Sequence, residues 1–242
     1  MKKLSLVLLS VAAMSILTAC GAKGDKLVMA TNAAFPPYEY LEGDKVVGID
    51  AEIAQAIADD LGKELIIEDM AFDSVITAVQ SGKADIAVAG ITVTEDRKKN
   101  INFSDPYTEA AQVIIVQEGS SVATPDDLEG KSVGVQLGTT GDIYADDIAD
   151  ATVERYSKGF EAVSALMQGK IDAVIIDREP AKVFVSENAG LKVLDEEFTV
   201  EEYAIGMNKD DAELLNSVNA SIAKLKESGK LQEIVDKYIS AE

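Results

Sequence analysis

Short apolar runs alternate with amphipathic stretches along the chain from residue 26 onward. Apolar runs bounded by turn residues are typical of buried strands, whereas apolar residues three or four positions apart indicate helices. Ile53, Ile57 and Leu61 show the helical spacing, with Asp50 as the expected N-cap and Gly62 as the expected end. The whole pattern predicts strands at 26–31, 65–67, 86–89, 113–116, 133–135, 153–156 and 173–176, and helices at 50–61, 73–80, 140–148, 160–168, 210–228 and 231–239. Such alternation indicates an α/β fold with parallel sheets covered by helices.

The sequence contains an internal repeat of this pattern. Residues 78–85 and 165–172 both place the end of a helix before Gly-Lys, followed by an Asp and an apolar strand. One strand is followed by Gly90, and the other is followed by Asp177. Because open α/β sheets bind ligands at the carboxyl ends of their strands, we expect two lobes of similar topology with these residues at a shared cleft. Chance similarity between two βαβ units is the alternative.

The amino terminus has the pattern of an export signal. Two lysines precede an apolar segment at 4–17, which is shorter than the roughly 20 residues that cross a bilayer. Leu-Thr-Ala-Cys at 17–20 resembles a bacterial lipobox, which implies cleavage before Cys20 and attachment of diacylglycerol and a further acyl chain such as palmitate. We expect a signal peptide at 1–19, a lipidated tether at 20–25 and a protein outside the cytoplasm, lipid-anchored to the cell membrane. An ordinary secretory signal with an incidental cysteine is the alternative.

Composition removes several functional classes. The net charge of −21 argues against nucleic-acid partners. The chain has no histidine and a single cysteine, which excludes Ser-His-Asp and Cys-His catalysis, HExxH zinc chemistry and thiolate metal sites. We therefore expect neither a cofactor nor a metal, and a binding protein in place of an enzyme.

Two charged residues lie near the ends of the matching strands. Arg97 follows the strand that ends at Gly90, in a turn that Thr94 is expected to cap. Taken singly, Arg97 is more often a solvated surface cation, and Asp177 is more often the cap of a helix that starts at Arg178. As a pair from facing lobes, the guanidinium suits a carboxylate and the carboxylate suits an ammonium. Together they predict a site for a zwitterion.

A glycine-rich turn and three aromatic residues are further candidates for a ligand site. Gly-Thr-Thr-Gly at 138–141 joins a predicted strand to a predicted helix, where backbone N–H groups attract an anion. The turn lacks the lysine of a P-loop, so nucleotide binding is unsupported. Phe35 lies in a loop that contains two prolines, and its ring is expected to form one wall of the cleft. Tyr38 and Phe72 are more often core residues.

The motifs together resemble the extracytoplasmic polar amino-acid-binding proteins of bacterial ABC importers, which are solute-binding lipoproteins. The resemblance is carried, in order along the chain, by ATNAAFPPYE at 30–39, GIDAE at 48–52, AGITVTEDR at 89–97, FSDPY at 103–107, VQLGTTG at 135–141 and IDAVIID at 171–177. It implies a two-lobed periplasmic-binding-protein-like fold, in which each lobe is a mostly parallel sheet flanked by helices. It also implies a free amino acid as the ligand and the permease subunits of an ABC transporter as partners.

The resemblance assigns roles to individual residues. It implies that Arg97 binds the α-carboxylate of the ligand, assisted by the backbone N–H groups of Thr92 and Thr140. It implies that Asp177 binds the α-ammonium, assisted by the Gly90 carbonyl and the Thr92 hydroxyl.

The remaining predicted ligand contacts concern the side chain of the ligand. Phe35 and Phe72 match positions that line or sandwich it, and Thr139 lies beside them in the glycine-rich turn. Many members carry Asp where this chain has Asn32, and Gln136 is likewise uncharged. A neutral amide both donates and accepts hydrogen bonds, so we expect glutamine or a similar ligand, with arginine, lysine or histidine next. Acids elsewhere in the cleft could replace the missing Asp.

The expected mechanism is closure of two lobes about a hinge. We expect one lobe at 26–111 with 205–242, the other at 112–204, and crossing strands near 112–117 and 200–205. A ligand that completes its contacts only on closure stabilises the closed form, which the permease would recognise. A monomer is the simplest expectation. The alternatives are a dehydratase-type enzyme on the same fold and a ligand-sensing subunit of a signalling system.

Overall fold

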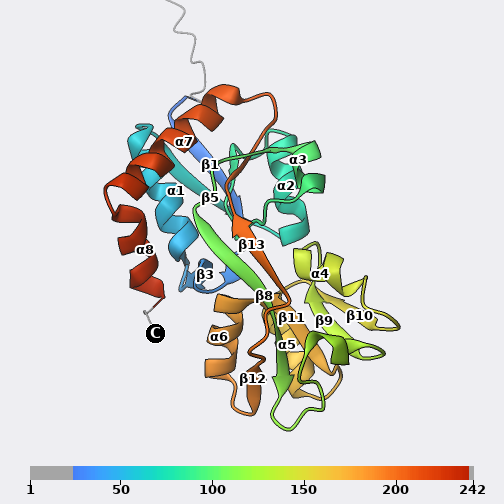
Figure 1. Ribbon diagram of the computed structural model, residues 1–242. Coiled ribbons are helices and arrows are strands. Elements are labelled where there is room, and N and C mark those ends of the chain that lie inside the picture. The colour runs from blue at the N-terminus through green and yellow to red at the C-terminus, as the bar shows by residue number, and fades with distance from the viewer. Residues whose placement is uncertain (1–23, 240–242) are drawn as a thin grey trace, which may run out of the picture.

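The computed structural model describes residues 24–239 as two lobes, each built around one β-sheet covered by helices (Figure 1). The expected signal peptide and Cys20 lie outside the described residues. No helix within residues 24–239 has the length and apolar character needed to cross a membrane.

The first lobe has a five-stranded sheet in the order β5-β1-β6-β14-β7. Its strands are β1 (Lys26–Thr31), β5 (Glu64–Asp69), β6 (Ile86–Ala87), β7 (Asn102–Phe103) and β14 (Gly206–Met207). One face packs on α1 (Ile49–Asp60), α7 (Ala212–Glu227) and α8 (Lys230–Tyr238), and the other packs on α2 (Phe72–Gln80). The short helix α3 (Glu95–Asn100) and a small sheet of β2 (Ala34–Phe35), β3 (Glu39–Glu42) and β4 (Lys45–Val47) complete this lobe.

The second lobe has a sheet in the order β10-β9-β11-β8-β12. Its strands are β8 (Thr108–Gln117), β9 (Ser132–Gln136), β10 (Thr152–Tyr156), β11 (Ala173–Asp177) and β12 (Leu191–Val193). The helical elements are η1 (Pro125–Leu128), α4 (Thr140–Ala145), α5 (Gly159–Met167) and α6 (Arg178–Glu187). Alternate residues of β8 enter different cores, with Ile114 in the α4 core and Ile115 in the α5–α6 core. Burial on both faces explains why the strand is a continuous apolar run.

The α/β prediction is confirmed, but the sheets are mixed where we expected mostly parallel ones. In each lobe three strands are parallel: β5, β1 and β6 in the first, and β10, β9 and β11 in the second. β14 and β8 pair antiparallel with this core, on β6 and β11, and β7 and β12 pair antiparallel with β14 and β8 in turn. The sequence pattern missed them in part because β7 and β14 are only two residues long, too short to show a period.

The internal repeat is real in three dimensions. Asp85 accepts a hydrogen bond at 2.8 Å from the backbone N–H of Val28, at the start of β1. Asp172 accepts the equivalent bond at 2.8 Å from Ser132, at the start of β9. Because each aspartate links the strand that follows it to the neighbouring parallel strand, the two repeats build the same βαβ arrangement.

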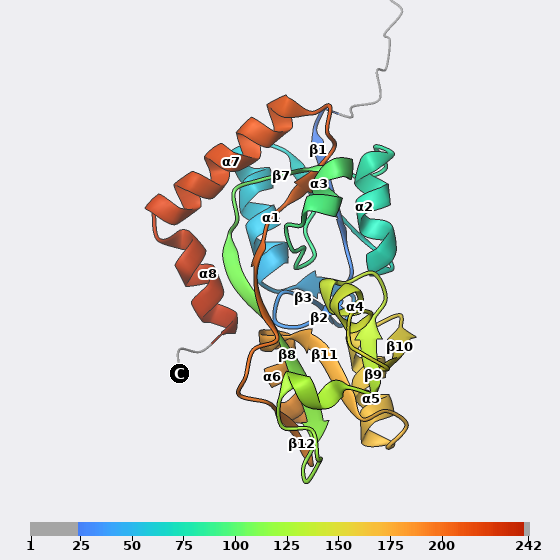
Figure 2. The same cartoon turned by 45° about the vertical axis from the view of Figure 1, so that its right-hand side comes forward.

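Two strands run side by side between the lobes, β8 in green and β13 (Thr199–Tyr203) in orange (Figures 1 and 2). They pair antiparallel, with Gln112 opposite Thr199 and Thr108 opposite Tyr203. The lobe limits expected from the sequence remain a prediction.

The prediction that Asp50 caps the first helix is wrong. Gly48 holds the N-cap position of α1, and Asp50 lies inside the first turn, fully buried. Its carboxylate accepts hydrogen bonds from the Tyr107 hydroxyl at 2.8 and 2.9 Å and from the Gly90 N–H at 2.8 Å. The predicted cap is therefore a tertiary anchor between α1 and the loop after β6. The helix predicted at 140–148 also ends early, at Ala145.

Candidate functional site

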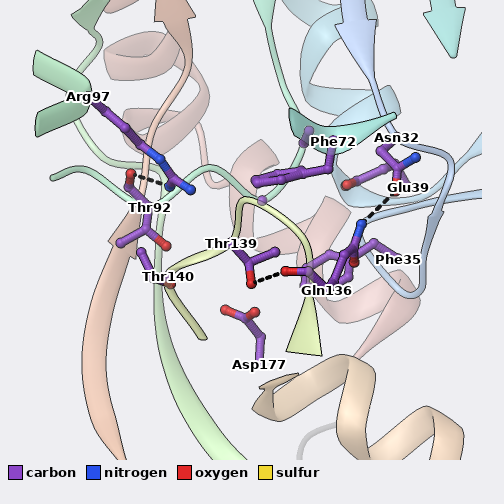
Figure 3. A pocket seen from close by; sticks show the side chains of 12 residues that line it. Asn32, Phe35, Glu39, Phe72, Thr92, Arg97, Gln136, Thr139, Thr140 and Asp177 are labelled. Atoms are coloured by element: carbon purple, nitrogen blue, oxygen red, sulfur yellow. Dashed lines mark hydrogen bonds between the residues drawn. The ribbon is translucent and has the colours of Figure 1, made fainter. Parts of the chain in front are cut away.

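All ten residues predicted to contact a ligand line one pocket between the lobes (Figure 3). They are Asn32, Phe35, Phe72, Gly90, Thr92, Arg97, Gln136, Thr139, Thr140 and Asp177. Glu39 and Ala89, which were not predicted, complete the lining. Several of these residues lie at or just after the carboxyl ends of parallel strands, where open α/β sheets bind ligands.

Arg97 is a buried cation in this pocket. Thr94 caps α3 as predicted, because its hydroxyl accepts the Arg97 N–H at 3.1 Å. Only 7% of Arg97 is exposed, so the interpretation as a solvated surface residue is wrong. Its guanidinium donates to the carbonyl oxygens of Thr92 at 2.9 Å and Gly138 at 3.1 Å, and it lies 5.6 Å from the centre of the Phe72 ring.

The Arg97 guanidinium has no carboxylate oxygen within 4.0 Å among residues 24–239. Burial lowers its pKa because the charged form is desolvated. Buried charges are normally paired, so this cation is suited to an anion supplied from outside the chain.

Asp177 supplies the opposite charge. It occupies the N-cap position of α6, but its side chain makes no capping hydrogen bond, which overturns the alternative interpretation of this residue. The carboxylate instead accepts a hydrogen bond from the Tyr203 hydroxyl. Burial raises the pKa of Asp177 to about 7, although the Tyr203 bond opposes this rise. The group is therefore poised to ionise when a cation approaches.

The Phe72 ring lies between Arg97 and Asn32 in Figure 3, so the pocket continues past the two charges toward a polar end. There Asn32 donates to the Met70 carbonyl at 2.7 Å and accepts from the Gln136 amide at 3.0 Å. The second bond joins the two lobes, since Asn32 follows β1 and Gln136 ends β9. Phe35 stacks on Tyr38, with ring centres 6.0 Å apart.

The two threonines of the glycine-rich turn make different hydrogen bonds. The Thr139 hydroxyl accepts from the Asp142 N–H at 3.2 Å and donates to the Gln136 carbonyl at 2.8 Å, so it caps α4. Thr140 is 2% exposed, and its hydroxyl oxygen accepts a hydrogen bond from Gln112 at 3.3 Å. The turn is therefore held rigidly at the edge of the pocket.

Glu39 is the charged pocket residue that the sequence did not reveal. It is 1% exposed, and no described residue donates a hydrogen bond to either of its carboxyl oxygens, although the carboxyl group itself hydrogen-bonds with Asp50. Burial, followed by the charge of Asp50, raises the pKa of Glu39 well above its usual range. A single glutamate between two tyrosines, at the start of the short strand β3, carries no sequence signal of burial, because most glutamates are exposed. Residues 24–239 contain no group of three side chains arranged to hold a metal ion.

Comparison with known proteins agrees with this geometry. Residues 27–241 match the model of the bacterial extracellular solute-binding proteins, family 3. The arginine-binding extracellular protein ArtP of Bacillus subtilis is 32% identical over 255 residues, covering 100% of both chains. The ABC transporter glutamine-binding protein GlnH of the same organism is 30% identical over 267 residues, covering 99% of this chain and 98% of GlnH.

The solved structure of an ancestral arginine-binding protein bound to arginine superposes with a TM-score of 0.86 and 39% sequence identity. The match covers 89% of this chain and 98% of that protein. With the family match over nearly the whole chain and full-length relatives of 30% identity or more, this chain belongs to family 3 of the bacterial extracellular solute-binding proteins, which includes amino-acid-binding proteins of ABC transporters.

Proposed function

We propose that this protein is an extracytoplasmic receptor that binds a polar L-amino acid between its lobes and delivers it to the permease of an ABC importer. The observation that carries the proposal is the buried Arg97 guanidinium without a carboxylate partner, in one pocket with the Asp177 carboxylate. The two groups complement the α-carboxylate and the α-ammonium of an amino acid. The named relatives ArtP and GlnH, which bind arginine and glutamine, support the same ligand class.

For the side chain of the ligand we favour arginine. Glu39 lines the pocket with a buried carboxyl group that shares a hydrogen bond with Asp50 but receives none from a described donor, which leaves acceptor capacity for a guanidinium. Asn32 is neutral, so the preference for glutamine drawn from the sequence stays a competing prediction. A cationic ligand would draw Glu39 into its ionised form, because an opposite charge lowers the pKa of a carboxyl group.

The test is the thermal stability of the purified protein, stripped of ligand by unfolding and refolding, with each of the twenty amino acids. A ligand at 1,000 times its Kd adds about 4 kcal/mol of stability, which raises the melting temperature clearly. A rise with arginine supports the proposal in full. A rise only with glutamine keeps the receptor and rejects the role given to Glu39. No rise with any amino acid rejects the receptor.

An enzymatic role has less support. The relatives are named as binding proteins, and the chain has no histidine for acid–base catalysis. We therefore expect an amino acid bound by the protein to be recovered unchanged after prolonged incubation. Chromatographic detection of a new product would favour the dehydratase alternative.

Membrane attachment through Cys20 belongs to the same proposal. The lipobox-like sequence supports acylation of this cysteine, which would hold the receptor near its permease. We expect labelled palmitate to enter the protein in cells, and Cys20→Ser to prevent labelling and release the protein from the membrane. Labelling that persists in Cys20→Ser would reject this site. We expect a monomer in solution.

A further inference from the structure

Each of the two strands that join the lobes carries one buried polar side chain behind the ligand pocket. Gln112 on β8 is 1% exposed, and Glu201 on β13 is 6% exposed. Their neighbour Glu202 is exposed, because successive residues of a strand point to opposite faces. Two polar groups buried at the junction of the lobes need hydrogen-bond partners, and those partners come from the ligand pocket.

The partners are the two threonines that line the pocket from opposite lobes. The Thr92 hydroxyl donates to Glu201 Oε2 at 2.7 Å. The Gln112 amide nitrogen donates to the same Glu201 oxygen at 3.2 Å and to the Thr140 hydroxyl oxygen at 3.3 Å. A continuous chain of hydrogen bonds therefore runs from Thr92 in the first lobe to Thr140 in the second, through the two joining strands.

Glu201 determines which groups donate and which groups accept in this chain of hydrogen bonds. An ionised carboxylate can only accept hydrogen bonds, so the Thr92 hydroxyl must direct its single proton toward Glu201. The Thr92 oxygen then presents only lone pairs to the pocket. The Gln112 amide must likewise turn its nitrogen, not its oxygen, toward the carboxylate. That nitrogen also donates to Thr140, so the Thr140 hydroxyl keeps its own proton for another acceptor.

Close packing around Gln112 supports this chain of hydrogen bonds. A Cβ atom at Gly141 would lie 2.9 Å from the Gln112 amide oxygen and 3.2 Å from Ile175 Cγ2. A larger residue at this position would displace the Gln112 amide oxygen, so the glycine lets the amide keep its place. The charge of Glu201 also opposes the lowering of the Arg97 pKa by burial, so the same carboxylate helps to keep the carboxylate-binding cation charged.

We propose that Glu201 and Gln112 are positioning residues that give the two pocket threonines opposite hydrogen-bonding roles, Thr92 as an acceptor and Thr140 as a donor. An α-ammonium group, which only donates, is then favoured beside Thr92, and a carboxylate, which only accepts, is favoured beside Thr140. The inference rests on the proposed amino-acid receptor and adds the residues that select an α-amino acid over its α-hydroxy analogue. An α-hydroxyl group has one proton and cannot donate to both Thr92 and Asp177, so its lone pairs face one of these acceptors, whereas an ammonium group has three protons and no lone pair.

The test is calorimetric titration of L-arginine and L-argininic acid, its 2-hydroxy analogue, into the wild type and three variants. Removal of the acceptor in Glu201→Ala lets the Thr92 hydroxyl rotate and donate to the hydroxy acid. The ratio to compare is the Kd of L-argininic acid divided by the Kd of L-arginine. We expect this ratio to fall about tenfold, in line with one hydrogen bond gained or lost. Glu201→Gln retains an acceptor oxygen at the same place and should restore most of the wild-type ratio. Glu202→Ala, on the exposed face of the same strand, should leave the ratio unchanged.

Equal weakening of both ligands by Glu201→Ala would overturn the inference, because a merely structural role lowers both affinities together. If Glu201→Ala does not fold, Glu201→Met takes its place, since it keeps volume and lacks the acceptor. If the screen of twenty amino acids selects glutamine, the same proteins are titrated with glutamine and 2-hydroxyglutaramic acid. If the wild type binds no amino acid, the proposed receptor function itself is rejected. That outcome is distinct from rejection of the role given to Glu201.

Discussion

At the scale of single residues, the pocket is defined by opposite charges that are buried with few partners. Arg97 is held by two carbonyl oxygens, and Asp177 is held by the Tyr203 hydroxyl. Neither group neutralises the other by direct contact within the described residues. The free energy of burying each charge is therefore offset most fully when a ligand carries the complementary group.

Arg97→Ala should abolish tight binding without unfolding the protein. The ligand carboxylate would be buried without its cation, at a cost of roughly 3–4 kcal/mol, or between two and three orders of magnitude in Kd. Calorimetry with arginine and urea unfolding measure the two effects. Lys98→Ala is the matched control, because Lys98 is an exposed cation on the same helix. Unchanged affinity in Arg97→Ala would contradict the site.

Binding should weaken as the pH falls below about 7. The pKa of Asp177 is about 7 in the protein without ligand, so an ammonium group must displace a proton at lower pH. One such proton weakens binding by up to about tenfold per pH unit below the pKa. Titrations between pH 5 and 8 give the slope.

The stability of the ligand-free protein should depend on pH in the opposite direction to ligand binding. The folded-state pKa of Asp177 exceeds the value of about 4 in the unfolded chain, so the folded state holds more protons between pH 4 and 7. The contribution of Asp177 to the free energy of unfolding therefore falls as the pH rises through that window. Asp177→Asn, which cannot titrate at this position, should lose the part of each dependence that Asp177 contributes. Asp50 and Glu39, whose pKa values are also raised by burial, are common to both proteins and cancel in the comparison. Identical profiles for the two proteins would contradict the assignment.

At the scale of elements, strand ends and tight turns place the pocket residues. The turn before α1 is the tightest of these turns. Gly48 has φ +120°, and a Cβ atom there would lie 2.2 Å from the Tyr38 carbonyl oxygen. The close approach lets the Ile49 N–H donate to the Pro37 carbonyl at 3.1 Å and the Asp50 N–H donate to the Tyr38 carbonyl at 2.9 Å. The loop that carries Phe35 and Glu39 is thereby fixed to α1.

Gly48→Ala should destabilise the protein by roughly 3 kcal/mol or more, because a steric clash with backbone adds to the strained φ. Gly43→Ala is the control. Gly43 also has a positive φ, of +60°, but a Cβ atom there would have no neighbour within 4 Å. Its substitution should cost only about 1–2 kcal/mol. Urea unfolding measures both, and equal losses would show that φ alone, not the close approach, requires the glycine at position 48.

At the scale of the whole molecule, a few polar contacts close the cleft. Arg97 donates across it to Gly138, and Gln136 donates across it to Asn32. A Cβ atom at Gly138 would lie 3.2 Å from Asp73 Cβ, so the lobes touch at this point. Hydrogen bonds of this kind contribute little net free energy against water, about 1 kcal/mol each. We therefore expect closure to depend on the ligand.

Arginine should reduce the radius of gyration of the ligand-stripped protein, because binding selects the closed arrangement. Small-angle X-ray scattering with and without arginine measures the change. Arg97→Ala is the control, and it should show no change at an arginine concentration that saturates the wild type but not this weakly binding variant. A radius of gyration that arginine leaves unchanged in the wild type, under conditions where calorimetry shows binding, would contradict closure by the ligand.

The sequence by itself determined the parallel strands, the repeat and the positions that line the pocket. Strands buried on both faces leave continuous apolar runs, and ligand residues follow directly where these runs end, so both signals are local. The family motifs added Asn32, Thr92 and Gln136 to these positions and gave the residues their roles. The α3 cap at Thr94 was predicted correctly because a helix cap depends only on nearby residues. The antiparallel strands β7 and β14 were missed because two residues are too few to show a pattern.

Only the tertiary structure decided which polar residues are buried together. Thr92 and Glu201 are 109 positions apart, and Asp50 and Gly90 are 40 apart, yet both pairs are hydrogen-bonded. Glu39 and Glu201 each have the composition of surface residues, and neither is marked by a period or a motif that reveals burial. Their chemistry arises from low exposure and from neighbours brought in by the sheets. Burial depends on the packing of the whole chain, and a local pattern of residues does not contain that information.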